Sequence, residues 1–116
     1  MKIDVQIKGA EQAIGKLKAH QLLTKENVKQ VIAESTISIK GGTVSRTPVD
    51  TGNLKNSWNS ELENNGLTGI ISNPVEYAPH VEWGTVKMSA QPMLTHSYEE
   101  EMPIYLRNLK KALKRT

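Results

Sequence analysis

The stretch SWNSELENNGLTGIIS, residues 57–72, carries Asn65-Gly66 between two segments of alternating apolar and polar residues. Asn-Gly adopts the positive φ angles of a tight hairpin turn, so this pattern predicts two antiparallel strands. Before the turn, polar residues alternate with Trp58, Ser60 and Leu62. After it, one face of the strand is expected to comprise Leu67, Gly69 and Ile71, with Ile70 on the other face. Since helical patterns lie on both sides of the hairpin, the chain is predicted to be an α+β protein.

The residues before the hairpin predict one strand and two helices. Apolar residues at every second position in residues 3–7 predict a strand that ends at Gly9. Residues 10–22 have roughly helical spacing and predict a short helix. A longer helix is predicted over residues 24–45, because Val28, Ile32, Ser35 and Ile39 recur at helical spacing. Gly41-Gly42 is expected to bend or fray this helix, and Pro48 to end it.

The C-terminal part is predicted to be mainly helical. Residues 75–84 indicate a short helix capped by Gly84, and residues 85–91 a fourth strand. Pro92 suits the first turn of a long helix whose apolar stripe is formed by Leu94, Tyr98, Met102, Tyr105, Leu109 and Leu113. Pro103 should kink that helix. The predicted fold of the single domain, residues 1–116, is a small antiparallel sheet of three to four strands packed by a long central helix and a kinked C-terminal helix.

The Cys content, the apolar stretches and the charge distribution exclude several classes of function. The chain has no Cys, which excludes thiol nucleophiles and cysteine-bound metals. It has neither the apolar stretch of a signal peptide nor an 18-residue apolar run, so we expect neither a signal peptide nor a membrane span. The formal charge is +4 over residues 1–46, −6 over 47–101 and +5 over 102–116. Such segregation favours contact with a complementary surface, including another copy of the chain.

Asp50-Thr51-Gly52 has the tripeptide of aspartic proteases, in which two such Asp residues activate water. That chemistry requires a nearly all-β subunit, whereas a helix is predicted to enter this motif. We therefore interpret residues 47–54 as a structured corner: Pro48 stops the helix, Asp50 accepts N–H groups of the next turn, and Gly52 relieves a tight backbone. No catalytic residue and no enzymatic activity are predicted.

A metal site and a cofactor site are not predicted either. Glu76 and His80 are four residues apart with Glu82 nearby, but Pro79 disturbs the geometry and no further His is close in sequence. No phosphate-binding glycine loop is present.

Three landmarks occur in order: TPVDTGNLKNSW, then VEYAPHVEWGT, then AQPML at the start of the last helix. With these landmarks the chain resembles, over roughly residues 20–115, the small tail-component proteins of siphophages and prophages, which are tail-completion or head–tail joining proteins. His80 beside Pro79 departs from the family, where an aromatic residue is common. The structural motif residues carried by the resemblance are Pro48, Asp50, Thr51, Gly52, Leu54, Tyr77, Ala78, Val81, Glu82, Gly84, Thr85 and Pro92.

The resemblance implies a non-enzymatic morphogenesis protein of the virion neck or tail. Such proteins form rings, often six-fold, and contact head-connector and tail proteins. We expect residues 47–58 and 76–85 to form a rigid scaffold in which Trp58, Tyr77, Val81 and Trp83 are buried. Glu82 would pair with a backbone N–H of the Gly84-Thr85 turn, or alternatively form a salt bridge between subunits.

The hairpin tip near residues 64–66 and the basic C-terminal helix would meet neighbouring rings. The basic positions are Lys110, Lys111, Lys114 and Arg115. An alternative interpretation is a nucleic-acid or polyanion-binding module that uses this same helix, and its signature would be steep salt dependence. DNA contact is not predicted in the first interpretation.

Overall fold

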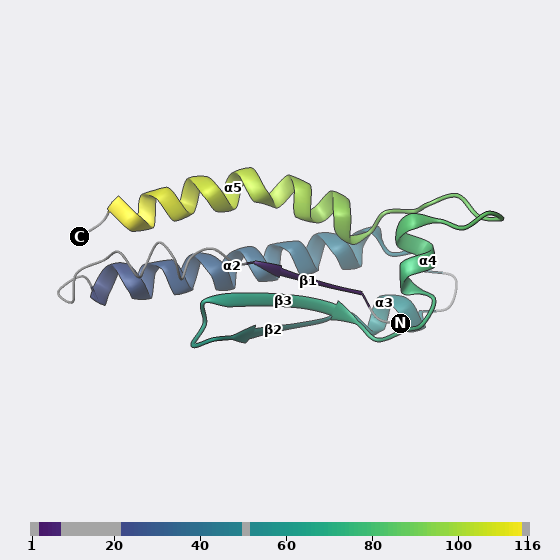
Figure 1. The fold of residues 1–116 in the computed structure, drawn as a ribbon, viewed down its shortest axis with the longest axis horizontal. Helices are drawn as coiled ribbons and strands as arrows, with labels where there is room; N and C mark the ends of the chain where they lie inside the picture. The colour runs from purple at the N-terminus through teal and green to yellow at the C-terminus, as the bar shows by residue number, and fades with distance from the viewer. Residues whose placement is uncertain (1–2, 8–21, 50–51, 115–116) are drawn as a thin grey trace.

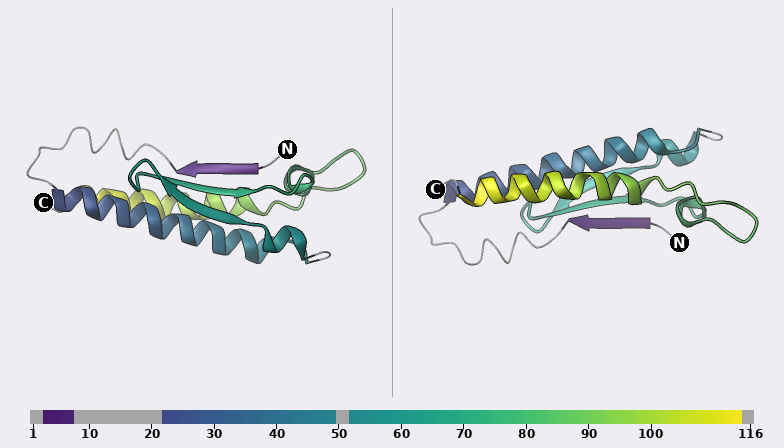
Figure 2. Two further views of the ribbon diagram at one scale, coloured as in Figure 1. Left: turned by 90° about the horizontal axis from the view of Figure 1, so that it is seen from below. Right: turned by 90° about the horizontal axis from the view of Figure 1, so that it is seen from above.

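The computed structural model describes residues 3–7, 22–49 and 52–114. The elements are β1 (Ile3–Ile7), α2 (Leu22–Arg46), α3 (Asn53–Asn56), β2 (Asn59–Glu63), β3 (Thr68–Asn73), α4 (Ala78–Trp83) and α5 (Leu94–Lys114). The molecule is elongated, with extents of 55 × 22 × 21 Å. Figure 1 shows α5 above α2 and the sheet below α2, and Figure 2 shows the two long helices running alongside each other in opposite directions. The α+β class is therefore confirmed.

The strands are antiparallel and have the order β1-β3-β2. The predicted hairpin is confirmed as β2 and β3, and Leu67 and Ile71 point into the core as expected. The turn is centred one residue earlier than Asn65-Gly66. Its two central residues, Asn64 and Asn65, have φ angles of 56° and 58°, and the N–H of Gly66 donates to Glu63 O at 3.1 Å. Asn tolerates this left-handed conformation better than most residues.

The predicted fourth strand is wrong. Residues 85–91 form a loop, closed by a hydrogen bond of 2.8 Å from the N–H of Thr85 to the carbonyl of Met88. The chain reverses direction between Thr85 and Met88, so these residues cannot form an extended strand. The predicted helix over residues 10–22 lies almost entirely outside the described residues.

Helix α2 continues through Gly41 and Gly42 to Arg46, so it is not frayed at the glycines, and it ends just before Pro48 as predicted. Gly42 has a packing role, since a Cβ there would lie 2.9 Å from Ser97 Oγ on α5. Gly69 of β3 has the same role on the other side of α2, because a Cβ at Gly69 would collide with the side chain of Thr36. The two glycines let α2 approach both of its neighbours closely.

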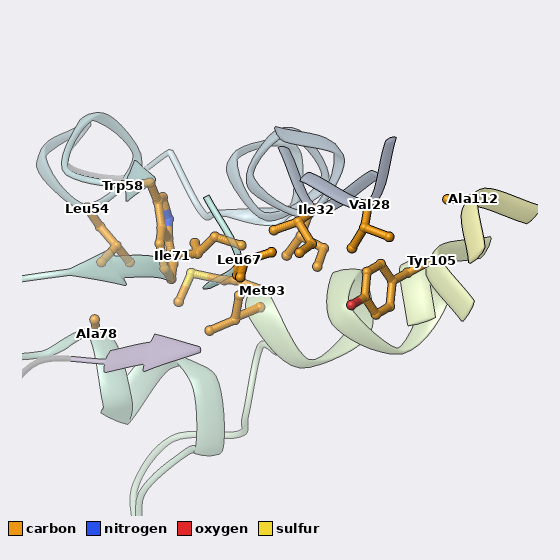
Figure 3. Close-up of a cluster of buried hydrophobic side chains, with 12 residues drawn as sticks. Val28, Ile32, Leu54, Trp58, Leu67, Ile71, Ala78, Met93, Tyr105 and Ala112 are labelled. Carbon is orange, nitrogen blue, oxygen red and sulfur yellow. The ribbon is translucent and has the colours of Figure 1, made fainter. Parts of the chain in front are cut away.

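The core lies between α2, β3 and α5, and its buried side chains are drawn in Figure 3. Val28, Ile32 and Ile39 of α2 are fully buried, which confirms the predicted helical face. Tyr105 is buried from the side of α5, and most of the other stripe residues of that helix pack against the cluster. Pro103 lies inside α5 without ending it, and Figure 1 shows α5 as one bowed helix. The exposed position of Pro103 lets water satisfy the carbonyl that its missing N–H leaves free.

Candidate interaction surfaces

Glu82 of α4 is buried and caps the start of α5. One carboxylate oxygen, Oε1, accepts the N–H groups of Met93 and Leu94, both at 2.9 Å. The other, Oε2, accepts the N–H of Thr95 at 2.8 Å. The first N–H groups of a helix have no partner within the helix, and the positive end of the helix dipole favours a carboxylate. The predicted pairing of Glu82 with the Gly84-Thr85 turn is therefore wrong, because its partners lie ten or so residues further along.

The protonation state of Glu82 follows from these contacts. Burial of the carboxylate acts to raise the pKa of Glu82. Hydrogen bonds from the Thr95 side chain and from the three backbone N–H groups outweigh that effect and lower the pKa below its ordinary value of 4.5. Glu82 is therefore ionised at neutral pH, and its charge is matched by the end of α5.

The loop between α4 and α5 is held in a defined shape. Gly84 has a φ of 80° and a ψ of 175°, and a Cβ there would lie 2.7 Å from the N of Ala90 and 2.9 Å from the O of Met88. The N–H of Gln91 donates to Val81 O at 2.8 Å. Gly84 thus serves backbone geometry as predicted, in a conformation that only glycine adopts readily.

The corner that precedes the hairpin is fixed by two buried side-chain hydrogen bonds. Trp58 Nε1 donates to Thr47 Oγ1 at 2.9 Å, and this ties the end of α2 to the start of β2. Asn73 Nδ2 donates to Leu54 O at 2.8 Å, which joins α3 to the end of β3. Gly52 has a φ of 69°. Asp50 and Thr51 lie outside the described residues, so the expected hydrogen bonds of Asp50 are not part of this description.

The predicted motif segments meet in space. Leu54 and Trp58 from the corner and Ala78 from α4 belong to one buried cluster with Ile71 and Met93 (Figure 3). Pro48 and Pro92 are half-buried, and α5 begins after Pro92 rather than at it.

The expectation that Tyr77 and Trp83 are buried is wrong. Trp83 is 64% exposed and Tyr77 37%, whereas Val81 is half-buried. The reason is the helical period of α4, which turns Ala78 and Glu82 inward and Trp83 outward.

The loop after α4 adds further exposed apolar side chains at the same end of the fold. We call these residues the apolar end, and they are Tyr77, Trp83, Val86 and Met88. Val86 is fully exposed and Met88 is 37% exposed. Figure 1 shows α4 and the loop after it at one end of the long axis.

The basic surface of α5 is the second candidate. Arg107, Lys110 and Lys111 are exposed and, with Pro103 and Leu106, line a groove of about 440 Å³. Lys114 is the last residue of α5, and Arg115 lies outside the described residues.

The metal site that the sequence analysis considered would use Glu76, His80 and Glu82. Glu76 precedes α4, and the carboxylate of Glu82 binds the start of α5, so these three side chains do not share one helix face. Among residues 3–7, 22–49 and 52–114, no group of three His, Cys, Asp or Glu is placed to hold a metal ion. No helix of the described part is long and apolar enough to cross a membrane.

Several polar contacts between the two long helices were not predicted from the sequence. Arg46 links the two long helices, since its Nη1 donates to Ser97 Oγ at 2.7 Å and its Nη2 contacts Glu100. Ser35 Oγ also donates to Glu101 at 3.1 Å. The only signal for these pairs is a polar residue at an inward position of an apolar helix face, which does not identify a partner.

The fold exposes several large apolar side chains at one end, and exposed apolar surface of this kind is common where soluble proteins bind other molecules. Comparison with known protein families identifies the family to which the chain belongs. The model of the family described as "Bacteriophage HK97-gp10, putative tail-component" matches residues 10–84. The chain belongs to this family of phage tail components, a class that is typically non-enzymatic. No curated protein and no solved structure matches the chain significantly.

Proposed function

We propose that this protein is a structural component of the phage neck or tail, of the tail-completion or head–tail connector kind. In this proposal it is made in the host cytoplasm, becomes part of the virion, and assembles as a ring, six-fold in the simplest case. It would contact the head connector and the neighbouring tail proteins.

The observation that carries this proposal is the apolar end. Trp83 and Val86 are large, apolar and exposed on backbone that Glu82 and Gly84 hold in place. Exposed apolar side chains on a preformed surface favour protein binding, because little ordering is needed when a partner covers them. Membership of a phage tail family makes other virion proteins the natural partners.

The motif residues fit a scaffold role in this proposal. Pro48, Gly52 and Leu54 would shape one side of this end, and Ala78, Glu82 and Gly84 the other. The hairpin tip and the basic surface of α5 would then be available to adjacent rings.

Deletion of the gene from the phage or prophage that carries it tests this function. We expect heads and tails that fail to form joined particles in negative-stain micrographs, and restoration of joined particles when the chain is supplied in trans. Purified wild-type virions should contain the chain by mass spectrometry. Infectious, normally joined particles that lack the chain would contradict the proposal.

The role of the basic surface has its own test. Changing Lys110, Lys111, Lys114 and Arg115 together to Gln is expected to reduce the yield of joined particles. Normal joining by this variant would exclude a role for these charges.

A second function, polyanion binding, is favoured by the exposed cations on α5. It predicts DNA binding that weakens steeply as salt rises, as neutralised phosphates release counterions. Absence of salt-dependent binding to duplex or single-stranded DNA would exclude it.

A further inference from the structure

The loop after α4 presents a projecting apolar side chain on a rigid backbone. Hydrogen bonds join Thr85 and Met88 in both directions, from Thr85 N at 2.8 Å and from Met88 N at 3.3 Å. The N–H of Lys87 donates to Thr85 Oγ1 at 3.2 Å. Val86 therefore stands at the tip of a closed turn, fully exposed, with the cationic Lys87 next to it. We call residues 84–90 the knob loop.

A groove of complementary character lies elsewhere on the molecule. It has a volume of about 350 Å³ and is formed between the middle of α2 and the strand β2. Its lining residues are Ala33, Thr36, Ile37, Ser60, Glu61 and Leu62. Ile37 is 68% exposed and Leu62 47%, so the groove offers apolar surface to a partner. The backbone of β2 pairs only with β3 among the described strands, which leaves the groove beside a sheet edge.

Charge and shape match between the knob loop and the groove. Val86 is convex and apolar, whereas the groove is concave and bordered by Ile37 and Leu62. Lys87 of the loop is positive and Glu61 of the groove is negative. Figure 1 shows the loop projecting beyond the end of the long axis, away from β2, so the loop of one molecule does not occupy its own groove.

We propose that the knob loop of one copy binds the α2–β2 groove of a second copy, with Lys87 of the first facing Glu61 of the second. This inference rests on the proposed function, since it names the contact through which subunits would join. Two different surfaces make the contact heterologous, so each copy keeps one free loop and one free groove and can add further copies. Successive contacts of this kind close into a ring if the rotation between subunits allows it.

Analytical ultracentrifugation of the purified full chain over a wide concentration range tests the contact. The wild type is expected to form assemblies larger than the 12.9 kDa monomer. Val86→Asp in the loop and Ile37→Asp in the groove should each weaken self-association by about tenfold or more, since each places a charge in an apolar contact. Ile104→Asp is the matched control, because Ile104 is 40% exposed on α5 and lies in neither the knob loop nor the groove.

A mixing experiment identifies the heterologous geometry. The Val86→Asp protein retains an intact groove and the Ile37→Asp protein an intact loop, so an equimolar mixture should form a one-to-one dimer that neither forms alone. Likewise Lys87→Glu and Glu61→Lys should each weaken association, and the double variant should restore it. All variants must show wild-type circular dichroism, and a substitution that fails this check is replaced by Val86→Ser or Ile37→Ser.

Two results would overturn the inference. One is a wild type that stays monomeric at every concentration, and the other is association that Val86→Asp and Ile37→Asp leave unchanged. Either result leaves the proposed function standing if the chain still restores joined particles in the deletion strain. Conversely, self-association through these surfaces in a chain that is absent from virions would contradict the proposed function and support the contact.

Discussion

The carboxylate of Glu82 accepts the backbone N–H of Thr95 at 2.8 Å, and this bond fixes the first turn of α5 to the short helix α4. With the bonds to Met93 and Leu94, one side chain satisfies three N–H groups in a buried place. Glu82 thus joins α4, which precedes the knob loop, to the start of α5, which covers the core.

Loss of this anchor should reduce stability in a graded way. Glu82→Gln keeps the shape and one acceptor oxygen but loses the charge, and we expect it to cost about 1–2 kcal/mol. Glu82→Ala leaves the three N–H groups without a partner and should cost about 3 kcal/mol or more. Urea unfolding at neutral pH measures both, with exposed Glu76→Gln as the control. A Gln variant as stable as the wild type would show that the charge is unimportant.

The stability that the ionised Glu82 carboxylate provides should depend on pH. Because the folded-state pKa of Glu82 is lowered, its contribution to stability is fully present above its ordinary pKa of 4.5 and is lost as the pH falls from there through the folded-state value. The stability difference between the wild type and Glu82→Gln should therefore be largest near neutral pH and shrink in acid. Other carboxylates cancel in this difference. A gap that stays constant down to strongly acidic pH would contradict the assignment.

Adjacent glycines in α2 should respond in opposite ways to alanine. Gly41 has no atom within 4 Å of a Cβ, so Gly41→Ala should stabilise the protein by up to about 1 kcal/mol through helix propensity. At Gly42 a Cβ would lie 2.9 Å from Ser97 Oγ, which is held by Arg46, so this gain should be cancelled or reversed. Thermal unfolding of the two variants gives the comparison. Equal stabilisation would mean that α2 and α5 are not packed this closely.

Gly84 should be among the least replaceable residues outside the core. Its backbone conformation is unfavourable for any other residue, and a Cβ would meet backbone atoms of Met88 and Ala90. We expect Gly84→Ala to cost about 2–4 kcal/mol or to free the knob loop. Gly66→Ala is the control, because it also has a positive φ, of 85°, but an added Cβ meets only the Lys29 side chain at 3.6 Å. Denaturation and hydrogen exchange of Met88 and Gln91 distinguish global from local loss.

The two tryptophans should behave differently. Trp58 is 4% exposed and donates to Thr47, so Trp58→Phe should cost about 1–3 kcal/mol. Trp83 is 64% exposed, so Trp83→Ala should change stability by no more than about 0.5 kcal/mol. Acrylamide should quench Trp83 strongly and Trp58 weakly in single-tryptophan variants. Similar quenching of both would contradict this placement, or would show Trp83 covered in an assembly if dilution restores its quenching.

Local patterns predicted the long helices and the hairpin because their signals are repeated over many residues. Three apolar positions and Ser35, at helical spacing, define the inward face of α2, and the Asn-rich turn between two apolar segments indicates the hairpin. The structure of residues 76–91 was harder to predict because α4 is short. An error in assigning its inward face leads to the wrong prediction that Trp83 is buried. Ala78 and Glu82 lie four residues apart, so a helical interpretation applied consistently would have turned Glu82 inward.

Partners distant in sequence could not be predicted from pattern. Glu82 and Thr95 are separated by a loop whose course depends on Gly84, and the pairing of Arg46 with Ser97 depends on the closeness that Gly42 allows. The sequence predicted a partner for Glu82 in the adjacent Gly84-Thr85 turn or in another subunit, because a local pattern does not indicate which distant backbone lies beside it. Its position becomes favourable only when the end of a particular helix is brought to it.

The position of α2 between the sheet and α5 has a consequence for synthesis on the ribosome. The chain emerges N-terminus first, so α2 and the hairpin leave the exit tunnel before α5 does. Until then, apolar side chains such as Ile32 and Ile39 lack one of their two covering layers. A chain stopped after residue 92 should therefore bind a hydrophobic dye or recruit chaperones, and addition of an α5 peptide should reverse this.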